Sequence, residues 1–183
     1  MKYTNTHILL RNRRVFANAR DAAFANAGNL IDEILARYGE NGAELMDPDE
    51  LKYLMADLVD RLYHARYFAR LSAGGNNLHP PPEIDYVEQA YIDHVETTYS
   101  YSRSINRFVH HELLIDSFVR EHTDVSEDFK TYLVEIRKSD ANLIYINLRS
   151  LRERMRVFAR YVDRPAAVAA EYYNQPLGIK QGG

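Results

Sequence analysis

The sequence contains no cysteine, no tryptophan and no long apolar run. Without cysteine the chain forms no disulfide and offers no thiolate to a metal ion. No apolar stretch approaches the roughly 18 residues of a membrane-spanning helix, and the block ILL near the N-terminus is too short for a signal-peptide core. A net charge of −3 provides no overall attraction to nucleic acid. We therefore expect no membrane partner, and a location in a virion if the protein is viral and in the cytoplasm otherwise.

Motifs of catalytic and cofactor sites are absent as well. The chain has no Gly-x-Ser-x-Gly, no P-loop and no Gly-x-Gly-x-x-Gly. It has seven histidines, but neither Glu-x-x-His, which di-iron bundles use, nor His-Glu-x-x-His, which zinc hydrolases use. We expect a protein that is not an enzyme and that holds no cofactor and no metal.

The composition that is present favours protein contacts. The basic residues comprise 18 arginines and 5 lysines, and there are 14 tyrosines. Arginine and tyrosine are enriched in protein–protein interfaces and lysine is depleted there. A coding bias toward arginine is the alternative explanation, so the composition alone does not decide between them.

Apolar residues recur at helical spacing along most of the chain. A first helix is predicted from Phe16 to Tyr38. A second begins at Asp47, with proline following at the first helical position, and ends at the sequence AGGNN. A third begins near Glu83 and reaches Glu121, with a kink or break at residues 100–104, where TTYSYSRS is poor in helix-forming residues.

A fourth helix is predicted up to Pro165. Either Asp124 or Ser126 is suited to cap its N-terminus. Asp140 occupies a position where the apolar stripe calls for an apolar residue, and a break near Ser139 is left open. The predicted fold is all-α, a bundle of four to five helices with extended N- and C-terminal arms. The expected boundaries are 1–14 for the N-terminal arm, 15–163 for the bundle, and 164–183 for a short helix and C-terminal arm.

Four arginines in the last long helix form a ridge, because they recur at spacings of three and four residues. Guanidinium groups bind carboxylates and phosphates well, and the ridge has one acidic residue, Glu153, among its arginines. We predict either a docking surface for an acidic partner or nucleic-acid backbone, or an ordinary solvated face. The ridge consists of Arg149, Arg152, Arg156 and Arg160.

The C-terminal sequence EYYNQPLGIKQGG carries apolar residues without helical spacing. It either lies along its own bundle or inserts into a neighbouring subunit. Irregularly spaced aromatic and aliphatic residues are typical of extended docking arms. The anchors that we expect to bind a partner are Tyr172, Tyr173, Leu177 and Ile179.

A small helical bundle with an extended C-terminal arm resembles in architecture the head–tail adaptor proteins of tailed phages. No sequence motif carries this resemblance, which is one of fold alone. It implies a non-enzymatic assembly protein that forms a homo-oligomeric ring and docks its arm into a neighbouring structural protein such as a portal. The alternative is a helical regulatory protein that binds a partner protein or nucleic acid through the arginine ridge.

Overall fold

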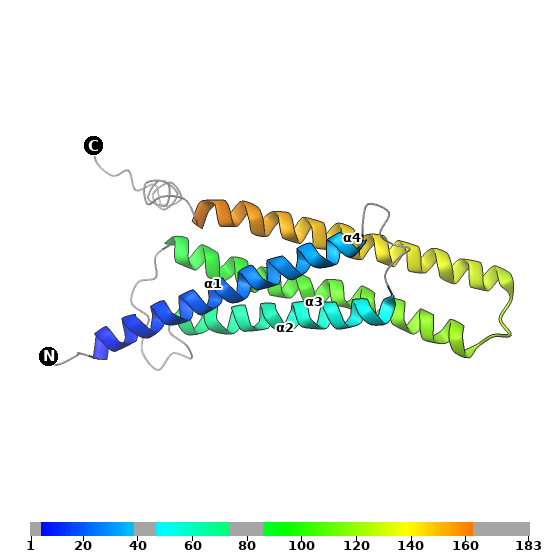
Figure 1. Ribbon diagram of the computed structural model, residues 1–183, viewed down its shortest axis with the longest axis horizontal. Helices are drawn as coiled ribbons and strands as arrows, with labels where there is room; N and C mark the ends of the chain where they lie inside the picture. Colours follow the sequence, from blue (N-terminus) through cyan, green and yellow to red (C-terminus); the bar gives the residue numbers. More distant parts are fainter. Residues whose placement is uncertain (1–4, 39–46, 74–85, 163–183) are drawn as a thin grey trace.

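The computed structural model describes residues 5–38, 47–73 and 86–162, and at residues 5–12, 86–87 and 160–162 it describes the backbone alone. These ranges form four α-helices and contain no strand (Figure 1). The all-α bundle predicted from the sequence is therefore confirmed. The helices are α1 (Asn5–Tyr38), α2 (Pro48–Ser72), α3 (Tyr86–Glu121) and α4 (Glu127–Val162).

The four helices run alternately up and down along the long axis of the molecule (Figure 1). Each helix packs against the next in the sequence, and α4 returns to contact α1. This is the up-down-up-down topology that short connections favour. It places residues of α1 and α4 side by side although they are more than a hundred positions apart.

One continuous apolar core fills the space between the helices. Each helix contributes a stripe of fully buried side chains, for example Leu58 on α2, Val95 on α3 and Leu148 on α4, none of which exposes any measurable surface. Burying a side chain of this size contributes about 1.5–3 kcal/mol relative to leaving it in water. The apolar stripes thus supply the main force that holds the bundle together.

Two helix starts follow directly from local sequence. Asp47 caps α2, because its side chain accepts a hydrogen bond from the backbone N–H of Asp49 at 3.1 Å. Ser126 caps α4, because its hydroxyl accepts one from the N–H of Phe129 at 3.3 Å. Of the two caps considered for α4, serine is the one used.

Of the kink or break predicted in the third helix, the break is absent. α3 is continuous through residues 100–104, although hydrogen bonds from small polar side chains to the backbone of their own helix do not stabilise it. Thr98 donates to the carbonyl of His94 at 2.8 Å, and Ser102 donates to that of Tyr99 at 2.7 Å. Both side chains are almost fully buried, so tertiary packing outweighs their poor helix propensity. α4 is likewise continuous through Ser139.

The N-terminal boundary also differs from the expectation. α1 begins at Asn5, so residues 5–14 of the expected N-terminal arm are helical. The short helix and arm expected over 164–183 lie outside the described residues.

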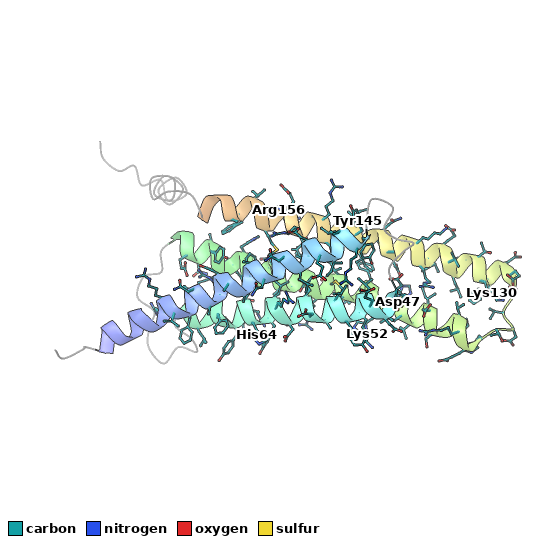
Figure 2. The ribbon with its side chains drawn as sticks, in the orientation of Figure 1. Asp47, Lys52, His64, Lys130, Tyr145 and Arg156 are labelled. Atoms are coloured by element: carbon teal, nitrogen blue, oxygen red, sulfur yellow. The ribbon has the colours of Figure 1, made fainter. Side chains whose placement is uncertain are left out.

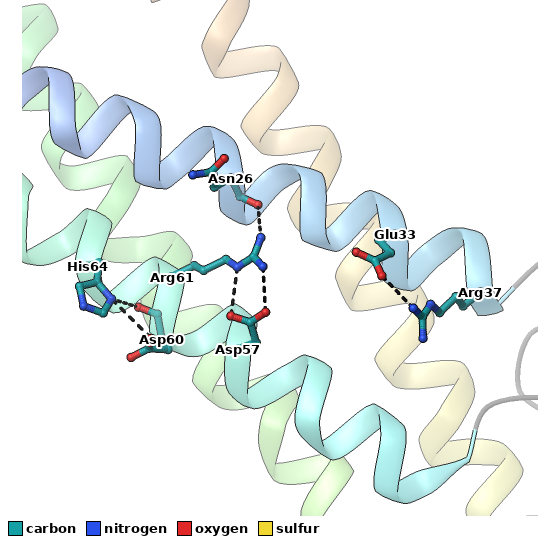
Figure 3. A network of polar contacts seen from close by, with 7 residues as sticks. All are labelled: Asn26, Glu33, Arg37, Asp57, Asp60, Arg61 and His64. Atoms are coloured by element: carbon teal, nitrogen blue, oxygen red, sulfur yellow. Dashed lines mark hydrogen bonds and ion pairs between the residues drawn. The ribbon is translucent and has the colours of Figure 1, made fainter.

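A hydrogen bond links α1 to α2, and an ion pair links α1 to α3. Arg61 of α2 forms two hydrogen bonds with Asp57, at 3.0 and 2.9 Å, and donates a third to the carbonyl of Asn26 on α1 at 3.2 Å (Figure 3). Arg20 of α1 is 3% exposed and pairs with Asp21 and with Glu88 of α3. A buried arginine is tolerated here because both acids neutralise it.

The ends of α3 and α4 project beyond α1 and α2 as a two-helix hairpin (Figure 1). Two buried acids lie near its base. Asp140, which interrupts the apolar stripe, forms a hydrogen bond with the imidazole of His111. Burial, the main influence on the Glu112 carboxyl, raises its pKa, and one of its oxygens has no hydrogen-bond partner in the described part of the chain.

Candidate partner-binding surface

The arginine ridge divides into inward and outward members. Arg152 on α4 forms a two-bond fork with Asp32 on α1, with Nε to Oδ1 at 3.0 Å and Nη2 to Oδ2 at 2.9 Å. Arg156, labelled on α4 in Figure 2, donates to the same carboxylate at 2.8 Å. Two ridge arginines therefore bind an acid of their own bundle. Arg149 is exposed, and the side chain of Arg160 lies outside the described residues.

Asp32 is the shared partner at this α1–α4 contact. The hydrogen bonds from Arg152, with the charges of both arginines, lower the pKa of the Asp32 carboxyl against the opposing effect of burial. A glycine one turn earlier makes the approach of Arg152 possible, since a Cβ built on Gly28 would lie 2.8 Å from Arg152 Cζ. Because Gly28 has no side chain, the guanidinium of Arg152 can lie directly against α1 at this position.

A wide groove lies between the N-terminal half of α3 and the C-terminal half of α4. Its volume is about 810 Å³. Ile146 and Val157 line it and are 59% and 42% exposed. Arg149 and Arg154 also line it, together with Asp93 and Glu153.

His94 forms part of the groove wall. Its ring stacks on Phe158 with centroids 4.4 Å apart and meets the edge of Phe24 at 5.5 Å. Burial, with a smaller contribution from the positive charge of Arg154, lowers the pKa of His94 to about 4. The imidazole is therefore neutral at neutral pH and extends the apolar wall.

The described part of the chain contains no group of three acidic or histidine side chains able to hold a metal ion. Among its helices, none has an apolar stretch long enough to cross a membrane.

Comparisons with known proteins returned nothing: no family model, no curated protein and no solved structure matches this chain.

Two features of this surface were not predicted from the sequence. Asp32 has no local pattern to distinguish it, because its partners are 120 and 124 residues away. The groove was missed because exposed Ile146 and Val157 resemble ordinary members of an amphipathic helix. Tyr172, Tyr173, Leu177 and Ile179 lie outside the described residues, so the structure does not place them.

Proposed function

We propose that this chain is a non-enzymatic assembly protein whose α3–α4 groove receives the C-terminal segment of a neighbouring copy. The exposed aliphatic lining of the groove, Ile146 and Val157, carries the proposal. Exposed side chains of this kind gathered in a groove mark binding sites in many proteins. The finer proposal is a component of a tailed-phage virion of head–tail connector type, and it rests on the resemblance in architecture.

The C-terminal segment has suitable chemistry and length for this groove. It offers two tyrosines and two aliphatic residues to the apolar wall, and Glu171 to Arg149 or Arg154. The groove follows α4 from Tyr145 to Phe158, roughly 20 Å of helix. Residues 172–183, when extended, span roughly 40 Å, which is enough to follow it from end to end.

A groove on one copy and a segment on the next form a head-to-tail contact. Such contacts are heterologous, and they close into a ring when the rotation between copies permits. The homo-oligomeric ring predicted from the sequence would follow from this one contact. A portal-like neighbour would be a further partner of the same surface or segment.

The regulatory alternative has less support. It relies on the arginine ridge, and Arg152 and Arg156 are already engaged by Asp32. Among the ridge arginines whose side chains are described, only Arg149 is not engaged by Asp32. One arginine contributes little to binding an acidic partner or nucleic acid.

Two complementary variants test the proposal. One lacks residues 172–183 and keeps an open groove; the other, Val157→Glu, keeps the segment but places a charge in the groove. Light scattering should find that neither variant assembles alone and that their mixture forms dimers, since one compatible contact remains. A full-length chain that stays monomeric at high concentration, or a truncated chain that still assembles, contradicts the proposal.

A further inference from the structure

A second depression lies further along α3, on the side that faces α2. Its volume is about 390 Å³, and Val59 of α2 forms one wall. The remaining lining comes from successive turns of α3 and consists entirely of polar side chains: Ser100, Arg103, Ser104, Asn106, Arg107 and His110.

The charge in this depression is all of one sign. Arg103 and Arg107 are exposed and lie one turn apart. Within the described ranges, no carboxylate lies within ion-pair distance of either, and no aspartate or glutamate lines the depression. Many other arginines of the bundle do have acidic partners: Arg20, Arg37, Arg61, Arg66, Arg70, Arg120, Arg137, Arg152 and Arg156.

Two like charges one turn apart on a helix destabilise it slightly, and an anion between them would remove that cost. The guanidinium of Arg103 lies 6.0 Å from the ring centroid of Tyr99, a contact that orients the group while its N–H donors stay free. His110 lies 3.4 Å from the Asn106 amide. The depression therefore presents several hydrogen-bond donors toward one small volume.

The number of donors and charges distinguishes between anions. A carboxylate has one negative charge and two oxygens, so it would leave one arginine uncompensated. A phosphate monoester carries about −1.5 to −2 charges at neutral pH and three terminal oxygens. Arginine forks suit both groups, but two forks with added hydroxyl and amide donors match phosphate better.

We propose that the depression between α2 and α3 is a binding site for a phosphate group, held by Arg103 and Arg107 with His110 and Asn106 as further donors. The volume leaves room for the molecule to which the phosphate is attached. That molecule is a small phosphate monoester, because each phosphodiester of a nucleic-acid backbone carries one charge and two terminal oxygens, as a carboxylate does. This site is independent of the α3–α4 groove and of the assembly proposed above.

The test uses the full chain and the double variant Arg103→Gln/Arg107→Gln. Both residues are exposed, and their replacement removes a repulsion, so the variant should fold as well as the parent chain, as circular dichroism can verify. Inorganic phosphate is titrated while the Arg Nε–H resonances are followed by NMR, with acetate as the carboxylate comparison. A duplex oligonucleotide, titrated separately, provides the phosphodiester comparison.

The matched control is Arg14→Gln, which removes one exposed arginine from α1. We expect saturable phosphate binding that is at least about tenfold weaker in the double variant and unchanged in the control. If the oligonucleotide binds more tightly than inorganic phosphate and the double variant loses that binding, the assignment to a phosphate monoester is contradicted. The proposal is overturned if phosphate produces no saturable shift, if acetate binds as tightly, or if the control loses binding equally.

Discussion

Arg152 on α4 and Asp32 on α1 form a two-bond fork across 120 positions of sequence, at 3.0 and 2.9 Å. The arginine is 17% exposed and the aspartate 38%. The contact sits where α4 returns to α1 and closes the bundle. It therefore couples the first and last helices through a polar contact beside the apolar core.

Replacing Asp32→Asn should destabilise the bundle at neutral pH by roughly 1 kcal/mol, since a partly exposed charged fork is worth about that much. The folded-state pKa of Asp32 is lowered, so its contribution is present above the unfolded pKa of about 3.9. It disappears as the pH falls through the folded pKa. Urea unfolding at pH 7 and pH 2 measures this. If the parent chain and Asp32→Asn still differ in their free energy of unfolding at pH 2, the prediction is contradicted.

Replacing Gly28→Ala should displace the guanidinium of Arg152. The added Cβ would lie 2.8 Å from Arg152 Cζ, and alanine is otherwise favoured over glycine in a helix by about 1 kcal/mol. In the Asp32→Asn background the carboxylate no longer holds Arg152, which can move away from the added methyl group. Gly28→Ala should then raise the free energy of unfolding. A double-mutant cycle measures the coupling. Equal effects of Gly28→Ala in both backgrounds would show that the two residues are independent.

Acid should destabilise the bundle through His94. Its pKa is about 4 in the folded chain and about 6.5 unfolded, so the unfolded state binds more protons between these values. The contribution of neutral His94 to the free energy of unfolding is fully present above about pH 6.5. It falls as the pH drops toward 4, by roughly 2 kcal/mol for a partly exposed ring.

The variant His94→Phe keeps the stacking on Phe158 and should lose less stability than the parent over that pH range. His64→Phe is the matched control, because His64 lies on the surface of α2 and is 54% exposed. Thermal unfolding at pH 7, 5.5 and 4.5 compares the three chains. The prediction fails if His94→Phe is as acid-sensitive as the control.

Glu112→Gln should stabilise the bundle at pH 7 by about 1 kcal/mol, because it removes a buried charge that is incompletely bonded. The pKa of Glu112 is raised. Below the unfolded pKa of about 4.3 the carboxyl is protonated in the folded chain, and no buried charge then lowers the stability. Stability is lost as the pH rises through the folded pKa. Glu135→Gln, at an exposed position, serves as control in the same unfolding titrations. A loss of stability in Glu112→Gln at pH 7 would mean that its attraction to Arg137 outweighs burial.

The features predicted correctly are those that depend on local sequence. The cap at Asp47 was predictable because an aspartate before a proline is recognised by its immediate neighbours. The apolar stripes were predictable because burial repeats with the helix period. Asp140 was noticed as a polar residue in an apolar position, but its partner His111 is on another helix.

The features that were missed depend on tertiary structure. Residues 100–104 have weak helix propensity, and only the packing of Thr98 and Ser102 against neighbouring helices makes α3 continuous. The inward role of Arg152 could not be predicted, since the ridge spacing is the same whether an arginine faces solvent or an acid on α1. Local spacing gives the face of a helix but does not identify what covers it.

The unequal lengths of the helices have a consequence for local opening. α3 and α4 have 36 residues each, whereas α2 has 25, and the hairpin that projects beyond α2 has few described apolar side chains that are buried, namely Ile115 and Leu133. A segment with so little core opens at a lower free energy than the bundle as a whole. The amides of 113–138 should therefore exchange with solvent deuterium through fluctuations that leave Leu58 and Val95 protected. We expect the hairpin and the rest of the bundle to open as two cooperative units.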